Sequence, residues 1–238
     1  APQKKMCVLQ DPPLLSPVDF GSIENLKEKL CIQGPIAMYV GNLERYQGLD
    51  LLIQAASLLR PHQSIDFVII GGDQEQIQSY RTRAKISAVG NRVHFIGKKP
   101  LGMLSGYLEQ ADILLSLRIE GTNTPMKIYS YLASGKPILA TDIDSHRQVL
   151  DSSCAVLVKP VPQSIKEGLL RLAGCADLRR MLGESGKRLA ETNYSRTNFD
   201  AKLLEFYEEL SCDIFTGRKK LYTAGREQCK TIRLKKND

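Results

Sequence analysis

Short apolar runs recur along the chain from Ile36 onward, and most of them end at a glycine or at another residue typical of turns. Short, nearly continuous apolar runs are typical of β-strands that are buried on both faces. We therefore predict six strands, over residues 36–40, 65–70, 92–96, 112–117, 137–141 and 155–158.

The segments between these runs mostly show helical spacing of apolar residues, as in Leu51, Leu52, Ala55, Leu58 and Leu59. Asp73 is a candidate N-cap and Gly135 a candidate C-cap. The pattern predicts helices over residues 50–59, 73–88, 101–110, 125–133 and 146–150, and then 164–172, 176–191 and 196–210.

Strands that alternate with helices form repeated βαβ units, and these build a parallel sheet through right-handed crossovers. The predicted fold class is therefore α/β: a doubly wound, Rossmann-like, six-stranded parallel sheet with helices on both faces, followed by C-terminal helices. We expect an irregular leading segment over residues 1–35, with a short helix near residues 23–30. The sheet domain spans residues 36–210, and a basic tail spans residues 211–238.

The charge is concentrated at one end of the chain. The net charge is +7, and the last 28 residues carry eight basic and three acidic residues. Such a tail is predicted to be a solvated end, with anionic lipid head groups or nucleic acid as alternative partners. Over the whole chain, 42% of the residues are hydrophobic and 25% are charged, which is typical of a soluble globular protein.

The cysteines give no support for a metal site. The six are scattered without Cys-x-x-Cys spacing, so we interpret them as incidental thiols of a reducing cytosol. Asp142 and Asp144 have Asp-x-Asp spacing, but they lie where a strand is expected to turn. We therefore predict no metal cofactor.

Open parallel sheets bind ligands where the carboxyl ends of strands lead into helices. The first such loop, Gly41–Gly48, has a glycine at each end, which lets backbone N–H groups approach an anion. Arg45 is a candidate partner for a diphosphate, and an exposed arginine in a plain turn is the alternative. The loop lacks the Gly-x-Gly-x-x-Gly spacing of a nicotinamide-binding turn, so it does not favour an oxidoreductase.

The loop from Glu120 to Pro125 leads directly into the next predicted helix. Pro125 fits the first helical position, and the backbone N–H groups of Met126, Lys127 and Ile128 are expected to face outward as an anion site. Gly121, Thr122, Asn123 and Thr124 offer backbone, hydroxyl and amide groups to sugar or phosphate oxygens, although ordinary helix capping explains them equally well.

The stretch Thr124–Thr141 resembles the donor-site signature of retaining GT-B glycosyltransferases of the group 1 type (glycosyltransferase family 4), Thr-Pro-x-Lys-x-x-Glu-Tyr-x-Ala-x-Gly-Lys-Pro. The segments Tyr39–Leu43, Gln47–Leu52, Val68–Gly72 and Val93–Gly97 are similar to the same family in the same order.

The resemblance implies half of a GT-B fold that binds a nucleoside-diphosphate sugar for retaining transfer to a glycan or lipid-linked acceptor. The implied catalytic residues are Glu120, Arg45 and Lys127. The implied substrate-binding residues are Gly41, Asn42, Gln47, Gly71, Gly72, Ile96, Gly97, Gly121, Thr122, Asn123, Thr124, Pro125 and Ser130.

Two departures from the family pattern keep alternatives open. Ser130 stands where the family has a glutamate that holds the ribose, and residues 1–35 are too few to build the first GT-B domain. We therefore expect the acceptor to be bound by a domain outside this sequence. A noncatalytic nucleotide-sugar-binding relative and half of a nucleotide-sugar epimerase are the alternatives.

The resemblance also narrows the expected partners. Assembly of polysaccharides or glycolipids is common in the family, so the basic tail is predicted to contact the inner face of a membrane peripherally. We expect a cytoplasmic protein and no nucleic acid as a partner.

Overall fold

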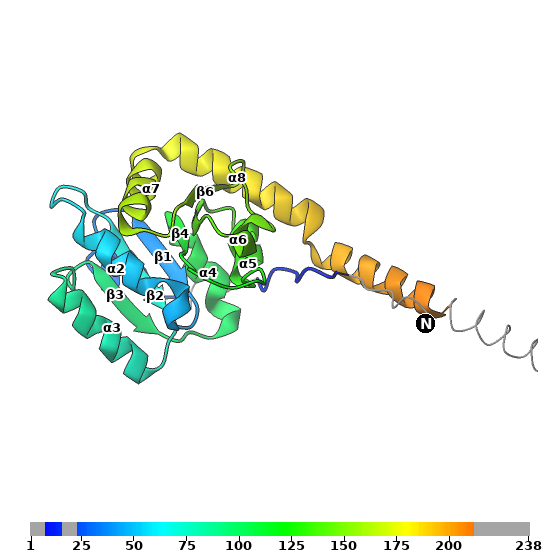
Figure 1. Cartoon of the computed structure of the whole chain (residues 1–238), viewed down its shortest axis with the longest axis horizontal. Helices are drawn as coiled ribbons and strands as arrows, with labels where there is room; N and C mark the ends of the chain where they lie inside the picture. Colours follow the sequence, from blue (N-terminus) through cyan, green and yellow to red (C-terminus); the bar gives the residue numbers. More distant parts are fainter. Residues whose placement is uncertain (1–7, 16–22, 212–238) are drawn as a thin grey trace, which may run out of the picture. The chain divides into compact units, whose positions relative to one another are not determined.

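Six parallel strands form one sheet in the order β3-β2-β1-β4-β5-β6 (Figure 1). The structure, a computed structural model, describes residues 8–15 and 23–211. The strands are β1 (Ile36–Val40), β2 (Asp66–Ile70), β3 (Val93–Gly97), β4 (Ile113–Ser116), β5 (Ile138–Thr141) and β6 (Ala155–Val158). This strand order is that of the doubly wound dinucleotide-binding fold, so the predicted fold class is confirmed.

Helices connect the strands and continue after the last one. They are α1 (Leu26–Lys29), α2 (Leu49–Ser57), α3 (Gln74–Ile86), α4 (Leu104–Glu109), α5 (Lys127–Ala133), α6 (Asp144–Arg147), α7 (Pro162–Gly174) and α8 (Ala176–Asn193), with two 3₁₀ turns, η2 (Arg45–Gln47) and η3 (Leu101–Met103). Asp73 caps α3 through a capping box, as predicted. The helix expected over residues 146–150 starts earlier, at Asp144.

Each face of the sheet carries its own apolar cluster. Tyr39, Phe67 and Leu115 point to the face covered by α2, α3 and α7. Met38 and Leu114 point to the opposite face, which α4, α5 and α8 cover (Figure 1). Because both faces are covered, most strand positions are buried, which explains the continuous apolar runs in the sequence.

The sheet opens between its two central strands. β1 pairs with β2 along its whole length, but it pairs with β4 only at Ala37 and Met38. Beyond that point the Val40 N–H donates to the Tyr131 hydroxyl at 2.9 Å. The strand order reverses here, and such a switch point is where this architecture places its ligand.

The leading segment contributes to the core. Asn25 caps α1 by accepting hydrogen bonds from the backbone N–H groups of Lys27 and Glu28, and Leu26 is fully buried in the layer beneath α4. Residues 11–195 form one compact unit, so packing begins before residue 36.

We expect Leu26→Ala to lower the free energy of unfolding by about 2–5 kcal/mol, because it leaves a cavity in a closed layer. Urea denaturation followed by circular dichroism measures this. The matched control is Leu101→Ala, at a position that is 59% exposed, where a change within about 0.5 kcal/mol is expected. Equal effects of the two variants would show that the leading segment is not part of the core.

Residues 196–211 form a further helix, close to the predicted 196–210. Arg196 and Asp200 pair along it, with 2.9 Å between Nε and Oδ1. This helix belongs to a separate unit of the chain. The predicted basic tail lies outside the described residues except for its first position.

Candidate functional site

Glycines form a cradle at the carboxyl ends of β1 and β2. Gly41, Gly71 and Gly72 all have positive φ. A Cβ atom on Gly71 would lie 1.9 Å from the Gly41 carbonyl oxygen, so only glycine allows the two strand ends to approach this closely. A cavity of about 390 Å³ lies here, lined by Val40, Gly41, Asn42, Glu44, Ile70, Gly71, Gly72, Asp73, Gln76, Lys98 and Lys99.

Lys127, the first residue of α5, extends its amine beneath the Gly41 loop. The Nζ atom lies 3.9 Å from the centroid of the Tyr39 ring and 3.1 Å from Gln47 Oε1. A Cβ atom on Gly41 would lie 3.1 Å from this Nζ. The structure therefore brings Lys127 against Gly41 and Gln47, two residues of the predicted Gly41–Gly48 loop, which lies far from Lys127 in the sequence.

The charge of Lys127 is poorly compensated. Burial and, as the smaller cause, the nearby Arg118 guanidinium together lower the pKa of its amine to about 7. Among the described residues no carboxylate forms an ion pair with either cation. An anion beside these two groups would replace the missing counter-charge.

Arg118 was missed by the sequence reasoning. Its Nη1 donates to the Asn123 carbonyl at 2.8 Å, its guanidinium lies 5.1 Å from the centroid of the Tyr46 ring, and its buried Nε has no hydrogen-bond partner. The available signal was a basic residue just after a strand, two positions before Glu120. Its importance comes from its proximity to Lys127.

A buried polar network holds the backbone of Arg118. The Thr141 hydroxyl donates to the Arg118 carbonyl. His146 Nδ1 lies 2.7 Å from the Thr141 carbonyl, and its Nε2 lies 2.8 Å from the Ser116 hydroxyl. Burial lowers the pKa of His146 to about 4. The imidazole is therefore neutral at physiological pH and occupied by protein partners.

Two hydrogen bonds to the Gln148 side chain hold the loop after β4. The Thr124 hydroxyl lies 2.6 Å from Gln148 Oε1, and Gln148 Nε2 donates to the Thr122 carbonyl at 2.8 Å. A Cβ on Gly121 would lie 2.5 Å from the Arg118 Cζ, so this glycine lets the guanidinium pack under the loop. Glu120 itself is exposed.

The expected anion site at the start of α5 needs correction. The helix begins at Lys127, so Pro125 is not its first residue. The Ile128 N–H, predicted to be free, donates to the Pro125 carbonyl at 2.9 Å. A turn stabilised this way leaves fewer free amides than a helix beginning at Pro125. The expected role of the Met126 and Lys127 N–H groups stays a prediction.

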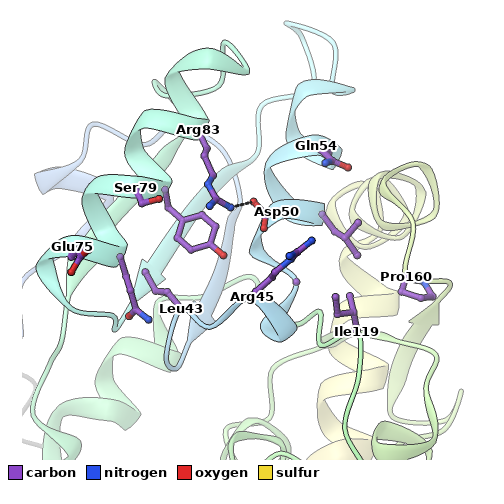
Figure 2. A pocket seen from close by; sticks show the side chains of 13 residues that line it. Leu43, Arg45, Asp50, Gln54, Glu75, Ser79, Arg83, Ile119 and Pro160 are labelled. Atoms are coloured by element: carbon purple, nitrogen blue, oxygen red, sulfur yellow. Dashed lines mark hydrogen bonds and ion pairs between the residues drawn. The ribbon is translucent and has the colours of Figure 1, made fainter.

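The remaining predicted residues fall into separate places. Arg45 lines a different cavity, between α2 and α3 (Figure 2). Ser130 is buried, and its hydroxyl accepts a hydrogen bond from the Leu14 N–H at 3.0 Å. Ile96 and Gly97 end β3 beside the glycine cradle, where the Gly71 N–H donates to the Gly97 carbonyl at 2.9 Å.

Lys98 and Lys99 line the cavity by the glycine cradle and were also missed. Lys99 pairs with Glu24 at 2.8 Å. The hydrogen bonds from Lys29 and Lys99 lower the pKa of Glu24 to about 2. Lys98 is exposed, and it has no ion-pair partner among the described residues.

Comparison with known proteins shows the family of the chain. The sequence profile described as "Glycosyl transferases group 1" matches residues 22–189. The chain belongs to this family. An uncharacterized glycosyltransferase of Methanocaldococcus jannaschii is 23% identical to this group 1 chain over 194 residues, which are 80% of the chain and 49% of the relative. The chain thus spans about half the length of this relative and of a second uncharacterized glycosyltransferase of the same organism.

Solved structures show the same fold at low identity. HepE of Anabaena in complex with UDP superposes on this group 1 chain with a TM-score of 0.71 at 14% identity, covering 82% of the chain and 54% of HepE. The C-terminal domain of a group 1 glycosyl transferase from Francisella tularensis, LpcC, gives a TM-score of 0.61 at 20% identity, covering 76% of the chain and all of that domain. The predicted relation to a GT-B C-terminal domain is confirmed.

Two further observations concern this group 1 chain. No helix within residues 8–15 and 23–211 is long and apolar enough to cross a membrane. In the same described ranges, no three His, Cys, Asp or Glu side chains form a group that could hold a metal ion. The expectation of a metal-free site stays a prediction.

Proposed function

We propose that this domain binds a nucleoside-diphosphate sugar and forms the donor half of a retaining glycosyltransferase. The observation that carries the proposal is the pair of neighbouring cations Lys127 and Arg118, which have no carboxylate partner among the described residues. The amine of Lys127 lies against Gly41 of the glycine cradle. A diphosphate supplies the charge that they lack, at the switch point where this fold binds ligands. The UDP complex of the fold relative HepE supports this ligand class.

The proposed chemistry is electrostatic. As the bond between the sugar and the diphosphate breaks, negative charge grows on the departing phosphate oxygens. Lys127 and Arg118 stabilise this charge from a site with little water, where such interactions are strong. In this proposal Glu120, which is exposed on the loop after β4, contacts the sugar. Because these cations balance the diphosphate, the proposed mechanism uses no metal ion.

The acceptor in this proposal is a glycan or a lipid-linked sugar, bound in part by another domain. A peripheral contact of the basic tail with the cytoplasmic face of a membrane belongs to the same proposal. Binding without turnover is the second candidate, because the Ser130 hydroxyl bonds to the Leu14 N–H where the family pattern has a ribose-binding carboxylate.

A thermal-shift screen of UDP, GDP and ADP, and of their hexose conjugates, tests the proposal. We expect one nucleoside diphosphate to raise the melting temperature and the other two to have little effect. At 100 times its dissociation constant, a ligand adds about 2.7 kcal/mol to the unfolding free energy. If none of the six compounds stabilises the protein at millimolar concentration, the proposed function is wrong.

A further inference from the structure

A second and larger cavity lies between α2 and α3, outside the glycine cradle (Figure 2). Its volume is about 860 Å³, within the range of sites that hold small organic ligands. Gln76 lines both cavities, so the two are adjacent. We call this cavity the α2–α3 groove; its other lining residues are Leu43, Arg45, Gly48, Asp50, Leu51, Gln54, Glu75, Ser79, Tyr80, Arg83, Ile119 and Pro160.

The charges of the α2–α3 groove cancel. Two arginines face two carboxylates in the lining, and Arg83 Nη1 pairs with Asp50 Oδ1 at 2.5 Å (Figure 2). The Arg83 guanidinium also covers the Tyr80 ring, 4.9 Å from its centroid. A groove with balanced charge does not attract a strongly anionic ligand such as a nucleotide.

The groove is instead matched to hydroxyl groups. Gln54 offers an amide donor and an amide acceptor, and Ser79 and Tyr80 contribute hydroxyls. The Gln76 amide bonds instead to the Asp73 N–H and to Glu44. Apolar side chains such as Leu51 also line the groove. Hydroxyl groups separated by C–H faces, as in a sugar chain, satisfy both kinds of surface without a charge.

The groove is also connected to the expected reaction centre. The Ile119 N–H donates to the Tyr46 carbonyl at 2.9 Å, and a Cβ on Gly48 would lie 1.9 Å from the Leu117 carbonyl oxygen. These contacts join the Tyr46–Gly48 segment to residues 117–119, which lead into the loop that carries Glu120. Ile119 lines the groove and directly precedes Glu120, the residue proposed to contact the donor sugar.

We propose that the α2–α3 groove binds a neutral oligosaccharide and holds the acceptor chain next to the donor site. The role as an acceptor site rests on the proposed function, whereas the binding of the sugar chain does not. The groove is separated from Lys127, so each site can be changed without the other.

Titration of the ¹⁵N-labelled full chain with neutral trisaccharides of glucose, mannose and N-acetylglucosamine tests the proposal by NMR. No nucleotide is added. We expect at least one trisaccharide to shift the amide resonances of residues 43–54 and 75–83 at millimolar concentration. Ser79→Trp fills the groove from α3 and is expected to weaken this binding by about tenfold or more. Ser57→Trp, on α2 but outside the lining, is the matched control and should bind as the unchanged protein does.

The outcomes separate the two proposals. If no trisaccharide shifts these resonances, or if Ser79→Trp binds as tightly as Ser57→Trp, the groove is not a sugar site. If the trisaccharide binds there while no nucleoside diphosphate stabilises the protein, the groove assignment stands and the donor function fails. Lys127→Met should leave trisaccharide binding unchanged, and a loss in that variant would place the sugar at the donor site instead.

Discussion

Replacing Lys127 by methionine is expected to weaken binding of the stabilising nucleoside diphosphate by about 10- to 100-fold. Hydrogen bonds to charged groups contribute about 1.5–3 kcal/mol, and this variant removes the buried ammonium while filling the same space. Isothermal titration calorimetry measures the loss. Methionine needs no counter-charge, so we expect no decrease in the free energy of unfolding at neutral pH.

The same amine makes binding depend on pH. In the empty site its pKa is about 7, so at higher pH the amine is mostly neutral. A bound diphosphate favours the ammonium form and raises that pKa, so binding takes up a proton. Affinity should therefore fall between pH 7 and 8.5, by up to about one power of ten per pH unit.

The groups that face Lys127 do not titrate in this window. The pKa of His146 is about 4, and burial raises the pKa of Tyr39 above its ordinary value. Lys127→Met should therefore lose the pH dependence together with the affinity. Lys85→Met, an exposed lysine of α3, is the matched control. A steep pH dependence that survives in Lys127→Met would rule out this amine as its source.

The Gly71→Ala variant is expected to lose about 3 kcal/mol or more of folding stability, and nucleotide binding with it. The new methyl group would lie 1.9 Å from the Gly41 carbonyl oxygen, and Gly71 has φ of +121°. Both strand ends would have to separate, which moves the Gly41 loop away from Lys127. The chain contains no tryptophan, so circular dichroism in urea is the suitable measurement.

Gly102→Ala is the matched control for this prediction. A Cβ atom there meets nothing within 4 Å, and Gly102 is not among the glycines with positive φ. We expect a stability change within about 0.5 kcal/mol. If Gly71→Ala unfolds at the same urea concentration as Gly102→Ala, the strand ends are not in the close contact described above.

The sheet, its class and most element bounds could be read from the sequence because they depend on local periodicity. The run Ile36–Val40, for example, corresponds to β1 residue for residue. The start of α5 could not be placed as well. Pro125 suits a first helical position, but α5 begins at Lys127, and the Ile128 N–H closes a turn back to the Pro125 carbonyl. Local propensity allows both arrangements. In the observed arrangement, hydrogen bonds between the loop before α5 and the Gln148 side chain hold that loop in place.

Amino-acid order was enough to identify a parallel sheet with glycine loops at its carboxyl edge and to single out Lys127. The tertiary structure decided the rest. It placed Arg118 near Lys127 and Lys98 at the cavity by the glycine cradle. It placed Arg45 in the separate α2–α3 groove and bonded the Ser130 hydroxyl to the leading segment. The physical reason is distance along the chain. The periodicity of apolar residues indicates the secondary structure of a segment and which of its side chains are buried. Whether residues from distant loops come into contact depends on strand order and side-chain packing.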